Sequence, residues 1–178
     1  MMELTMFQCD YCGAQFLEHQ TTCPKCGALM KVVASVTRTT SAAFTDKLRA
    51  ICIKYDGTPN LYLDDSISPQ RLATARERFN VPSDEVVVML YDDTLFGNNR
   101  LGFAICSDGL YWHNDWSVPS RRRFLAWPAF AERTIVLENR NVSLGRGDQI
   151  GMAGMGDKEA RAQVVALLNE IKASQQGL

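Results

Sequence analysis

Two stretches of the sequence decide the fold: Glu85-Val86-Val87-Val88-Met89-Leu90-Tyr91 and Leu101-Gly102-Phe103-Ala104-Ile105-Cys106. The turn residues Ser107-Asp108-Gly109 follow the second stretch and lead into Leu110-Tyr111-Trp112-His113. Runs of β-branched and aromatic residues separated by Gly, Asp and Ser are typical of antiparallel strands. A short turn between two such runs makes a hairpin. The sequence therefore predicts neighbouring strands at 85–91, 101–106 and 110–113.

The chain continues in short β-rich segments and then changes to a helical pattern. We expect strands at 123–127, 133–137 and 141–144, with 149–152 as a candidate seventh. Asp157 then caps a helix. The apolar stripe of that helix consists of Val164, Leu167, Leu168 and Ile171. A small antiparallel sheet that curls into an open barrel leaves a mouth, which such a helix can cover.

Two helices are predicted before these strands. Ser41 offers an N-cap for the first. Its apolar stripe is Phe44, Leu48, Ile51 and Tyr55. Ser68-Pro69 begins the second helix with proline at the first helical position, and Asn80-Val81-Pro82 ends it. Residues 31–40 are rich in β-branched residues and Ser, a composition that fits either a linker or one extended strand.

Two pairs of cysteines near the N-terminus have the spacing of metal ligands. Cys9 and Cys12 form the first pair and Cys23 and Cys26 the second, with ten residues between the pairs. Four thiolates at this spacing can bind one tetrahedral Zn²⁺. Two disulfides or four buried thiols are the alternatives. Four thiolates leave no open coordination position, so this zinc, one per chain, is expected to be structural.

The sequence resembles two known families. The N-terminal segment with its four cysteines resembles the zinc ribbon family. Residues 84–175 resemble the bacterial pleckstrin-homology-like (PH-like) domain. The phrases that carry this second resemblance are 89–97, 101–112 and the later Trp127. Neither resemblance identifies an activity.

These observations together predict an α+β protein with three segments. Residues 1–30 are expected to form the zinc ribbon, and residues 31–83 a linker and two-helix segment. Residues 84–178 are expected to form an open antiparallel β-barrel, PH-like and capped by the C-terminal helix. The ribbon is too short for a hydrophobic core of its own and therefore needs its metal to fold.

Composition and charge limit the ligands and the cellular location that we expect for the protein. The net charge is −1 at pH 7 and the isoelectric point is about 6.1, so no overall basic field favours non-specific nucleic-acid binding. No window is apolar over the length needed to span a bilayer, and the first residues lack the pattern of a signal peptide. Cys52 and Cys106 are expected to be core thiols. We expect a reducing, cytoplasmic location.

The pattern of polar residues favours a protein that is not an enzyme. Its two histidines, His19 and His113, lack an evident partner for acid–base chemistry. We interpret them as a loop residue and a polar strand end. The glycines between 145 and 156 are not followed by the Lys-Ser/Thr of a phosphate-binding loop. No catalytic residue is therefore predicted.

The loop at 92–100 contains two Asp and one Arg. Lipid-binding members of the pleckstrin-homology class use basic residues in their first hairpin loop, so no phosphoinositide ligand is expected here. Asp92 and Asp93 are instead expected to organise the loop by accepting hydrogen bonds from backbone amides. The amides concerned are those near Thr94, Asn98 and Asn99.

The concentrated basic run of the sequence is Arg121-Arg122-Arg123. Adjacent side chains of an extended segment point to opposite faces, so Arg121 and Arg123 are expected to share a face, with Trp116 nearby in sequence. Arginines beside an aromatic residue suit an acidic peptide or nucleic-acid phosphate. An ordinary solvated loop is the alternative.

Two functions are consistent with these features. The first is a non-enzymatic binding or adaptor protein, in which the ribbon and the PH-like domain mediate protein–protein interaction or self-association. The alternative is a nucleic-acid-binding accessory protein that uses the ribbon and the run from Arg121 to Arg123.

Overall fold

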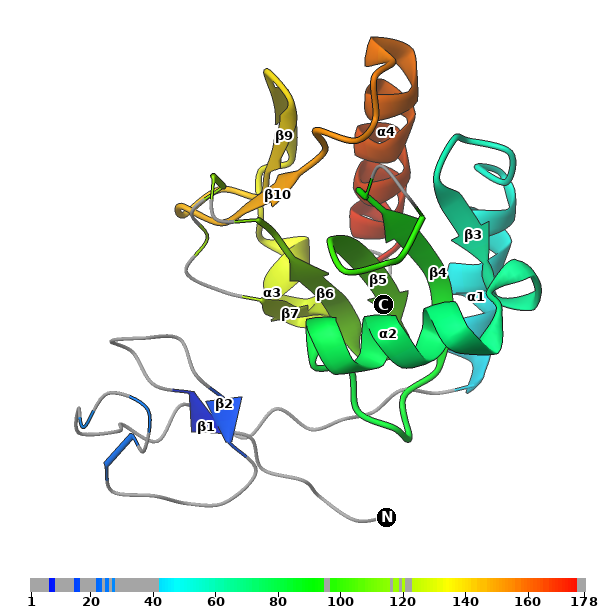
Figure 1. Ribbon diagram of the computed structural model, residues 1–178. Coiled ribbons are helices and arrows are strands. Elements are labelled where there is room, and N and C mark those ends of the chain that lie inside the picture. Colours follow the sequence, from blue (N-terminus) through cyan, green and yellow to red (C-terminus); the bar gives the residue numbers. More distant parts are fainter. Residues whose placement is uncertain are drawn as a thin grey trace. The chain divides into compact units, whose positions relative to one another are not determined.

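The computed structural model divides the chain into two compact units, Met1–Thr39 and Thr40–Leu178. Figure 1 shows both units with most of their helices and strands labelled. The structure describes residues 7–8, 15–16, 22–23, 25, 27, 42–94, 97–115, 117–118, 120 and 123–175.

The first unit contains a short antiparallel hairpin. Strands β1 (Phe7–Gln8) and β2 (Gln15–Phe16) pair with Phe7 opposite Phe16 and Gln8 opposite Gln15. The segment 9–14, which connects them and carries the first cysteine pair, lies outside the described residues.

The second unit is built on two antiparallel sheets and a C-terminal helix. The five-stranded sheet has the order β3-β4-β5-β6-β7, and the three-stranded sheet the order β10-β9-β8. The strands of the larger sheet are β3 (Leu61–Leu63), β4 (Val87–Asp92), β5 (Gly102–Cys106), β6 (Gly109–His113) and β7 (Phe124–Ala126). Those of the smaller sheet are β8 (Val136–Glu138), β9 (Asn141–Ser143) and β10 (Gln149–Gly151). The predicted α+β class, with antiparallel strands followed by a final helix, is confirmed.

Three of the four helices of this unit lie where the sequence predicts them, and the helix at Trp127–Ala131 was not predicted. They are α1 (Ala42–Ile53), α2 (Pro69–Phe79), α3 (Trp127–Ala131) and α4 (Lys158–Gln175), with a 3₁₀ turn η1 at Asp64–Ser66. The Ser68 side chain caps α2 by accepting a hydrogen bond from the Arg71 amide. Asn80 ends α2 in the left-handed conformation, with φ of 58°.

Two predicted strands differ from the structure at their ends. The strand expected at 123–127 ends at Ala126, because Trp127 and Pro128 open α3 instead. The Trp127 indole donates hydrogen bonds to the carbonyls of Cys106 and Ser107, which holds the ring over the β5–β6 turn. The strand expected at 133–137 begins only at Val136.

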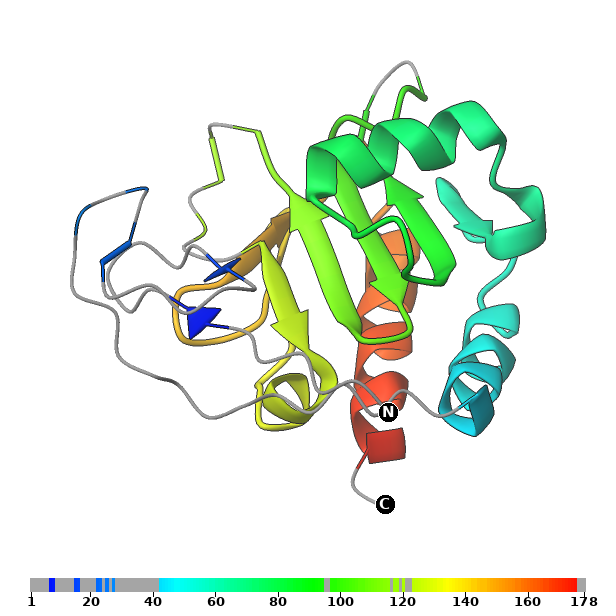
Figure 2. The same ribbon diagram turned by 90° about the horizontal axis from the view of Figure 1, so that it is seen from below.

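Helices α2 and α4 cover opposite faces of the five-stranded sheet. Figure 1 and Figure 2 show α2 across one face and α4 against the other. All residues of β4 are consequently buried. This double cover explains why residues 87–91 of β4 are continuously apolar instead of alternating.

Helix α4 supplies the centre of the hydrophobic core. Its predicted stripe of Val164, Leu167, Leu168 and Ile171 is fully buried, as expected. Leu48, Ile51 and Cys52 of α1 and Leu61 of β3 belong to the same buried cluster. The helical segment before residue 84 therefore shares one core with the later sheets. Among the described helices, none is long and apolar enough to cross a membrane.

Leu168→Ala is expected to lower the free energy of unfolding by about 2–5 kcal/mol, the range for a fully buried leucine whose cavity does not collapse. Chemical denaturation monitored by tryptophan fluorescence measures the change. Val165→Ala on the same helix is the control, because Val165 is only partly buried and should cost clearly less. Equal costs for both variants would contradict the assignment of Leu168 to the core.

A candidate anion-binding cleft

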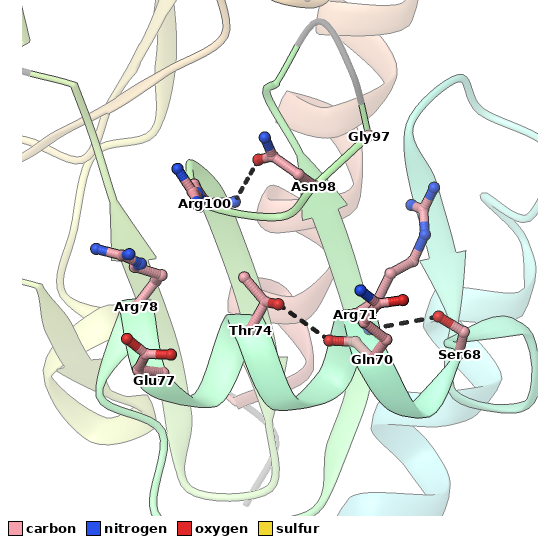
Figure 3. A pocket seen from close by; sticks show the side chains of 9 residues that line it. All are labelled: Ser68, Gln70, Arg71, Thr74, Glu77, Arg78, Gly97, Asn98 and Arg100. Atoms are coloured by element: carbon pink, nitrogen blue, oxygen red, sulfur yellow. Dashed lines mark hydrogen bonds between the residues drawn. The ribbon is translucent and has the colours of Figure 1, made fainter.

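A cleft of about 350 Å³ lies between α2 and the loop that connects β4 to β5. Its lining residues are Ser68, Gln70, Arg71, Thr74, Glu77, Arg78, Gly97, Asn98 and Arg100. Figure 3 shows their side chains, with the helix forming one wall and the loop the other. Three arginines and one glutamate give this lining an excess of positive charge.

The helix wall follows from the way α2 packs on the sheet. Ala75 and Phe79 are fully buried, and α2 contacts β5 and β6. Residues three and seven positions apart share a helix face, so Arg71, Thr74 and Arg78 form a stripe beside that buried face. Figure 3 shows Thr74 between the two arginines.

The Arg71 side chain is held in place by two neighbours. Its guanidinium carbon lies 4.1 Å from the centre of the Tyr62 ring, and its Nη1 lies 3.7 Å from Oδ2 of Asp92. At 3.7 Å this ion pair is too long for a hydrogen bond, and Nη1 is buried without a hydrogen-bond partner. Arg71 is therefore oriented by stacking on Tyr62 and by the charge of Asp92, and its Nη1 is buried without a hydrogen bond.

Asp92 organises the loop wall, as the sequence predicts. Its carboxylate, which is 1% exposed, accepts hydrogen bonds from the backbone amides of Thr94 at 2.9 Å and Asn99 at 3.1 Å. The Thr94 hydroxyl in turn accepts from the Asn98 amide at 2.9 Å, and Asn98 Oδ1 accepts from the Arg100 amide at 3.2 Å. This chain of bonds brings Asn98 and Arg100 to the cleft.

Asp93 is turned away from the cleft and towards β10. It accepts hydrogen bonds from the Tyr91 hydroxyl at 2.6 Å and from the amides of Gly154 at 2.8 Å and Ala153 at 3.2 Å. Burial raises its pKa, and these hydrogen bonds oppose the rise. Both carboxylates of this loop therefore accept hydrogen bonds within the protein, and the expectation of no phosphoinositide ligand stays a prediction.

His113 connects the cleft to the predicted arginine run. Its Nδ1 lies 3.0 Å from the carbonyl oxygen of Arg100. Its pKa is lowered, first by burial and then by the positive charge of Arg123, with a smaller effect of Arg78. Arg123 itself is exposed. These four residues therefore extend the basic region from the cleft onto the end of β6.

Only part of the predicted anionic contact can be located. Arg123 lies beside this basic region, whereas Arg121 and Trp116 are outside the described residues. Sequence reasoning did not single out Arg71, Arg78 or Arg100. The seven-residue spacing of Arg71 and Arg78 on a predicted helix was an available signal. Arg100 carries no such signal, because the fold of the chain brings its loop to α2.

The predicted zinc ligands are mostly outside the described part of the chain. Of the four cysteines, the structure describes only Cys23, which is buried. The Gly27 amide donates to the Cys23 carbonyl at 2.7 Å, and Gly27 has a φ of 72°. Gly27 is thus in the left-handed region, which glycine adopts without steric cost. Among the described residues no metal-binding group is found.

The remaining cysteines are core thiols, as predicted. Cys52 and Cys106 are fully buried. Burial raises the pKa of Cys52 to about 12 and that of Cys106 well above its usual value. Both thiols are therefore protonated and poorly nucleophilic at neutral pH.

Comparisons with protein-family models, with curated proteins and with solved structures find no match for this chain.

Proposed function

We propose that this protein is a non-enzymatic binding protein whose cleft between α2 and the β4–β5 loop takes an anionic segment of a partner protein. The observation that supports the proposal is the arginine lining. The guanidinium groups of Arg78 and Arg100 have no acceptor in the described part of the chain, and Arg71 keeps a buried donor unbonded. Guanidinium groups without a hydrogen-bonded acceptor, such as those of Arg78 and Arg100, are suited to carboxylate or phosphate.

The chemistry of the same lining favours recognition over catalysis. Ser68 is occupied as the cap of α2, and the Thr74 hydroxyl donates to the Gln70 carbonyl at 3.0 Å. A nucleophile in either position would need a neighbouring base, and the carboxylate of the lining, Glu77, has no such hydroxyl bonded to it. We therefore retain the adaptor interpretation and assign the cleft as its contact surface.

The element order of the second unit supports a PH-like architecture for this binding domain. Four consecutive antiparallel strands, β4 to β7, precede three more, β8 to β10, and α4 follows them. In this interpretation the two sheets form the open barrel and α4 covers one mouth, with α1, β3 and α2 as additions before it.

The binding proposal is tested with acidic ten-residue peptides, lysine-containing peptides of the same length and a ten-nucleotide oligothymidylate. Fluorescence anisotropy measures their binding to the full chain and to the triple variant Arg71→Gln, Arg78→Gln, Arg100→Gln. Arg140→Gln is the matched control, because Arg140 is an exposed arginine of the β8–β9 turn.

We expect the acidic peptides to bind the full chain and the Arg140→Gln control, and to be lost from the triple variant. Equal binding by all three proteins, or no binding of acidic peptides, would contradict the assignment. Preference for the oligonucleotide, with affinity that falls steeply as salt rises, would instead favour the nucleic-acid function.

We also propose that Cys9, Cys12, Cys23 and Cys26 hold one structural zinc ion. Elemental analysis should give one zinc per chain, and a thiol reagent should modify none of the six cysteines before the metal is removed. After chelation, four thiols should react, while Cys52 and Cys106 react only on unfolding, because their thiols are buried. Substantially less than one zinc, or immediate reaction in the untreated protein, would contradict the site.

A further inference from the structure

We infer that the anionic group of the ligand binds at the end of the cleft formed by Arg78 and Arg100, and that its binding is coupled to the uptake of a proton by the neighbouring His113. Affinity for an acidic peptide then rises as the pH falls. This inference rests on the proposed binding function of the same cleft. It deepens that function by naming the end that binds the anion and the residue that regulates its binding.

The positive charge at the Arg71 end of the cleft is offset within the protein. The Arg71 guanidinium stacks on Tyr62 and faces the Asp92 carboxylate, which is buried. Gly97 closes over this pair, because a Cβ atom at Gly97 would lie 3.0 Å from Nη2 of Arg71 and 3.8 Å from Oδ2 of Asp92. A ligand anion at this end would meet the negative charge of Asp92, so the other end of the cleft attracts it more strongly.

The other end of the cleft keeps its positive charge. Arg78 in the last turn of α2 and Arg100 in the β4–β5 loop both line the cleft. Figure 3 shows these two side chains on one side of Thr74 and the Arg71 guanidinium on the other. Neither Arg78 nor Arg100 has an acceptor for its guanidinium in the part of the chain that the structure describes. Together they exceed the single negative charge that Glu77 adds to the lining.

His113, the last residue of β6, lies on the face of the sheet that α2 covers. The preceding Trp112 is fully buried in the core cluster that contains the stripe of α4. Adjacent side chains of a strand point to opposite faces, so His113 is directed towards the face of α2, which contacts β6. Its Nδ1, 3.0 Å from the Arg100 carbonyl oxygen, carries the hydrogen of that bond, because a carbonyl oxygen only accepts. Nε2 is therefore the nitrogen that gains a proton.

Basic groups from three segments surround His113. Arg78 belongs to α2, Arg100 to the β4–β5 loop, and Arg123 precedes β7, where its carbonyl accepts a hydrogen bond from the Trp112 amide at 3.0 Å. Burial lowers the pKa of His113, and the positive charges of Arg123 and Arg78 lower it further, while the hydrogen bond to the Arg100 carbonyl opposes the change. The free protein therefore holds His113 largely neutral at pH 7.5.

The acidic groups of the same region do not offset these charges at His113. Asp92 is engaged by the amides of its own loop. Asp115, two residues after His113, accepts hydrogen bonds from the amide and hydroxyl of Ser117. Glu77 lines the cleft from α2. Among the described residues, no carboxylate forms an ion pair with His113.

The positive charge that attracts an anion therefore also repels the proton of His113. An anion bound beside Arg78 offsets that charge and makes protonation of the imidazole more favourable. Because coupling between two ligands is reciprocal, protonated His113 in turn raises the affinity for the anion. The pKa of His113 lies below its ordinary value of 6.5 in the free protein and rises in the complex. The gain in affinity therefore develops as the pH falls from about 7.5 to about 5.5.

The test measures the affinity of a glutamate-containing ten-residue peptide for the full chain at about pH 7.5 and about pH 5.5, by fluorescence anisotropy. Glutamate, with an ordinary pKa of about 4.3, stays mostly ionised over this range. We expect binding to be about threefold tighter at the lower pH, the size of one surface ion pair. An NMR titration of the histidine rings should show that the pKa of His113 rises when the peptide is bound.

Four variants assign the effect to this end of the cleft. His113→Asn keeps an amide donor for the Arg100 carbonyl but cannot gain a proton, so its affinity should be equal at the two pH values. His19 is the other histidine of the chain, and His19→Asn should keep the pH dependence. Arg78→Gln should weaken binding at both pH values and raise the pKa of His113 in the free protein, because one repelling charge is removed. Arg140→Gln should do neither.

The outcomes separate this inference from the function on which it rests. Equal affinity at the two pH values, with binding lost in the triple arginine variant, would overturn the coupling and leave the anion cleft. A pH dependence that persists in His113→Asn would also overturn it, because the gain would then come from the overall charge of the protein. Loss of the pH dependence in His19→Asn would have the same meaning for the coupling to His113. No binding of the peptide at either pH would overturn both. Circular dichroism of each variant confirms that the protein remains folded.

Discussion

Replacing Arg133 by methionine is expected to lower the free energy of unfolding by about 3–5 kcal/mol, the cost of leaving one charge of a buried ion pair without its partner. Both side chains of the pair are 2% exposed, and Nη2 of Arg133 lies 3.1 Å from Oδ2 of Asp148. Nη1 of Arg133 also donates to the Gly145 carbonyl at 3.1 Å. The arginine thus joins the end of α3 to the β9–β10 turn.

An exposed ion pair of the same region provides the control. Arg146 and Glu132 approach to 3.4 Å, but each side chain is 67% exposed. Arg146→Met should therefore cost at most about 1 kcal/mol. Urea denaturation, followed by the fluorescence of the buried Trp112 and Trp127, measures both variants. A similar small loss for Arg133→Met would show that the buried pair does not hold this corner of the protein.

Gly102→Ala is expected to destabilise the protein at least as much as Arg133→Met. It should lower the free energy of unfolding by more than about 4 kcal/mol, a loss that only a few kinds of mutation produce. Gly102 begins β5, the central strand of the five-stranded sheet, and pairs with Asp92 of β4 and His113 of β6. Its φ is +130°, and an added Cβ would lie 2.0 Å from the carbonyl oxygen of Tyr91. The three atoms nearest to that Cβ are the carbonyl oxygen and carbon of Tyr91 and the amide nitrogen of Asp93, all of them backbone, so no side chain can move to relieve the clash.

The loss in Gly102→Ala has two causes, the positive φ and the clash of the added Cβ, and Gly57→Ala separates them. Gly57 also has a positive φ, of +92°, but an added Cβ would have no atom within 4 Å. Its cost should therefore be limited to the backbone conformation, about 1–2 kcal/mol. If Gly102→Ala cost no more than Gly57→Ala, the close approach to Tyr91 would not exist in solution.

The Gly102 variant also bears on the cleft. Asp92, whose carboxylate organises the loop wall, faces Gly102 across β4 and β5. Where Gly102→Ala leaves the protein folded, it should shift that loop and weaken acidic-peptide binding. Gly57 lies in a turn after α1 and does not line the cleft, so Gly57→Ala should bind these peptides normally.

Local signals were sufficient to predict most of the elements. Ser68 and Pro69 begin α2, and Asn80 ends it, because capping and backbone conformation depend on neighbouring residues. The stripe of α4 predicted its buried face, since helical spacing alone decides which residues share a face. Strand ends were less predictable: Trp127 begins a helix, and its indole is bonded to carbonyls about twenty residues earlier in the chain.

The sequence by itself indicated most of the strands, the helices α1, α2 and α4, the buried stripe of α4 and the spacing of the four cysteines, whereas it did not indicate α3. The tertiary structure decided which side chains meet. Arg71 and Arg100 are far apart in the chain, and they line one cleft because α2 packs on the sheet and Asp92 ties the following loop by its amides. Local propensity acts over a few residues, whereas this cleft depends on packing and hydrogen bonds between distant segments, which no short pattern in the sequence records.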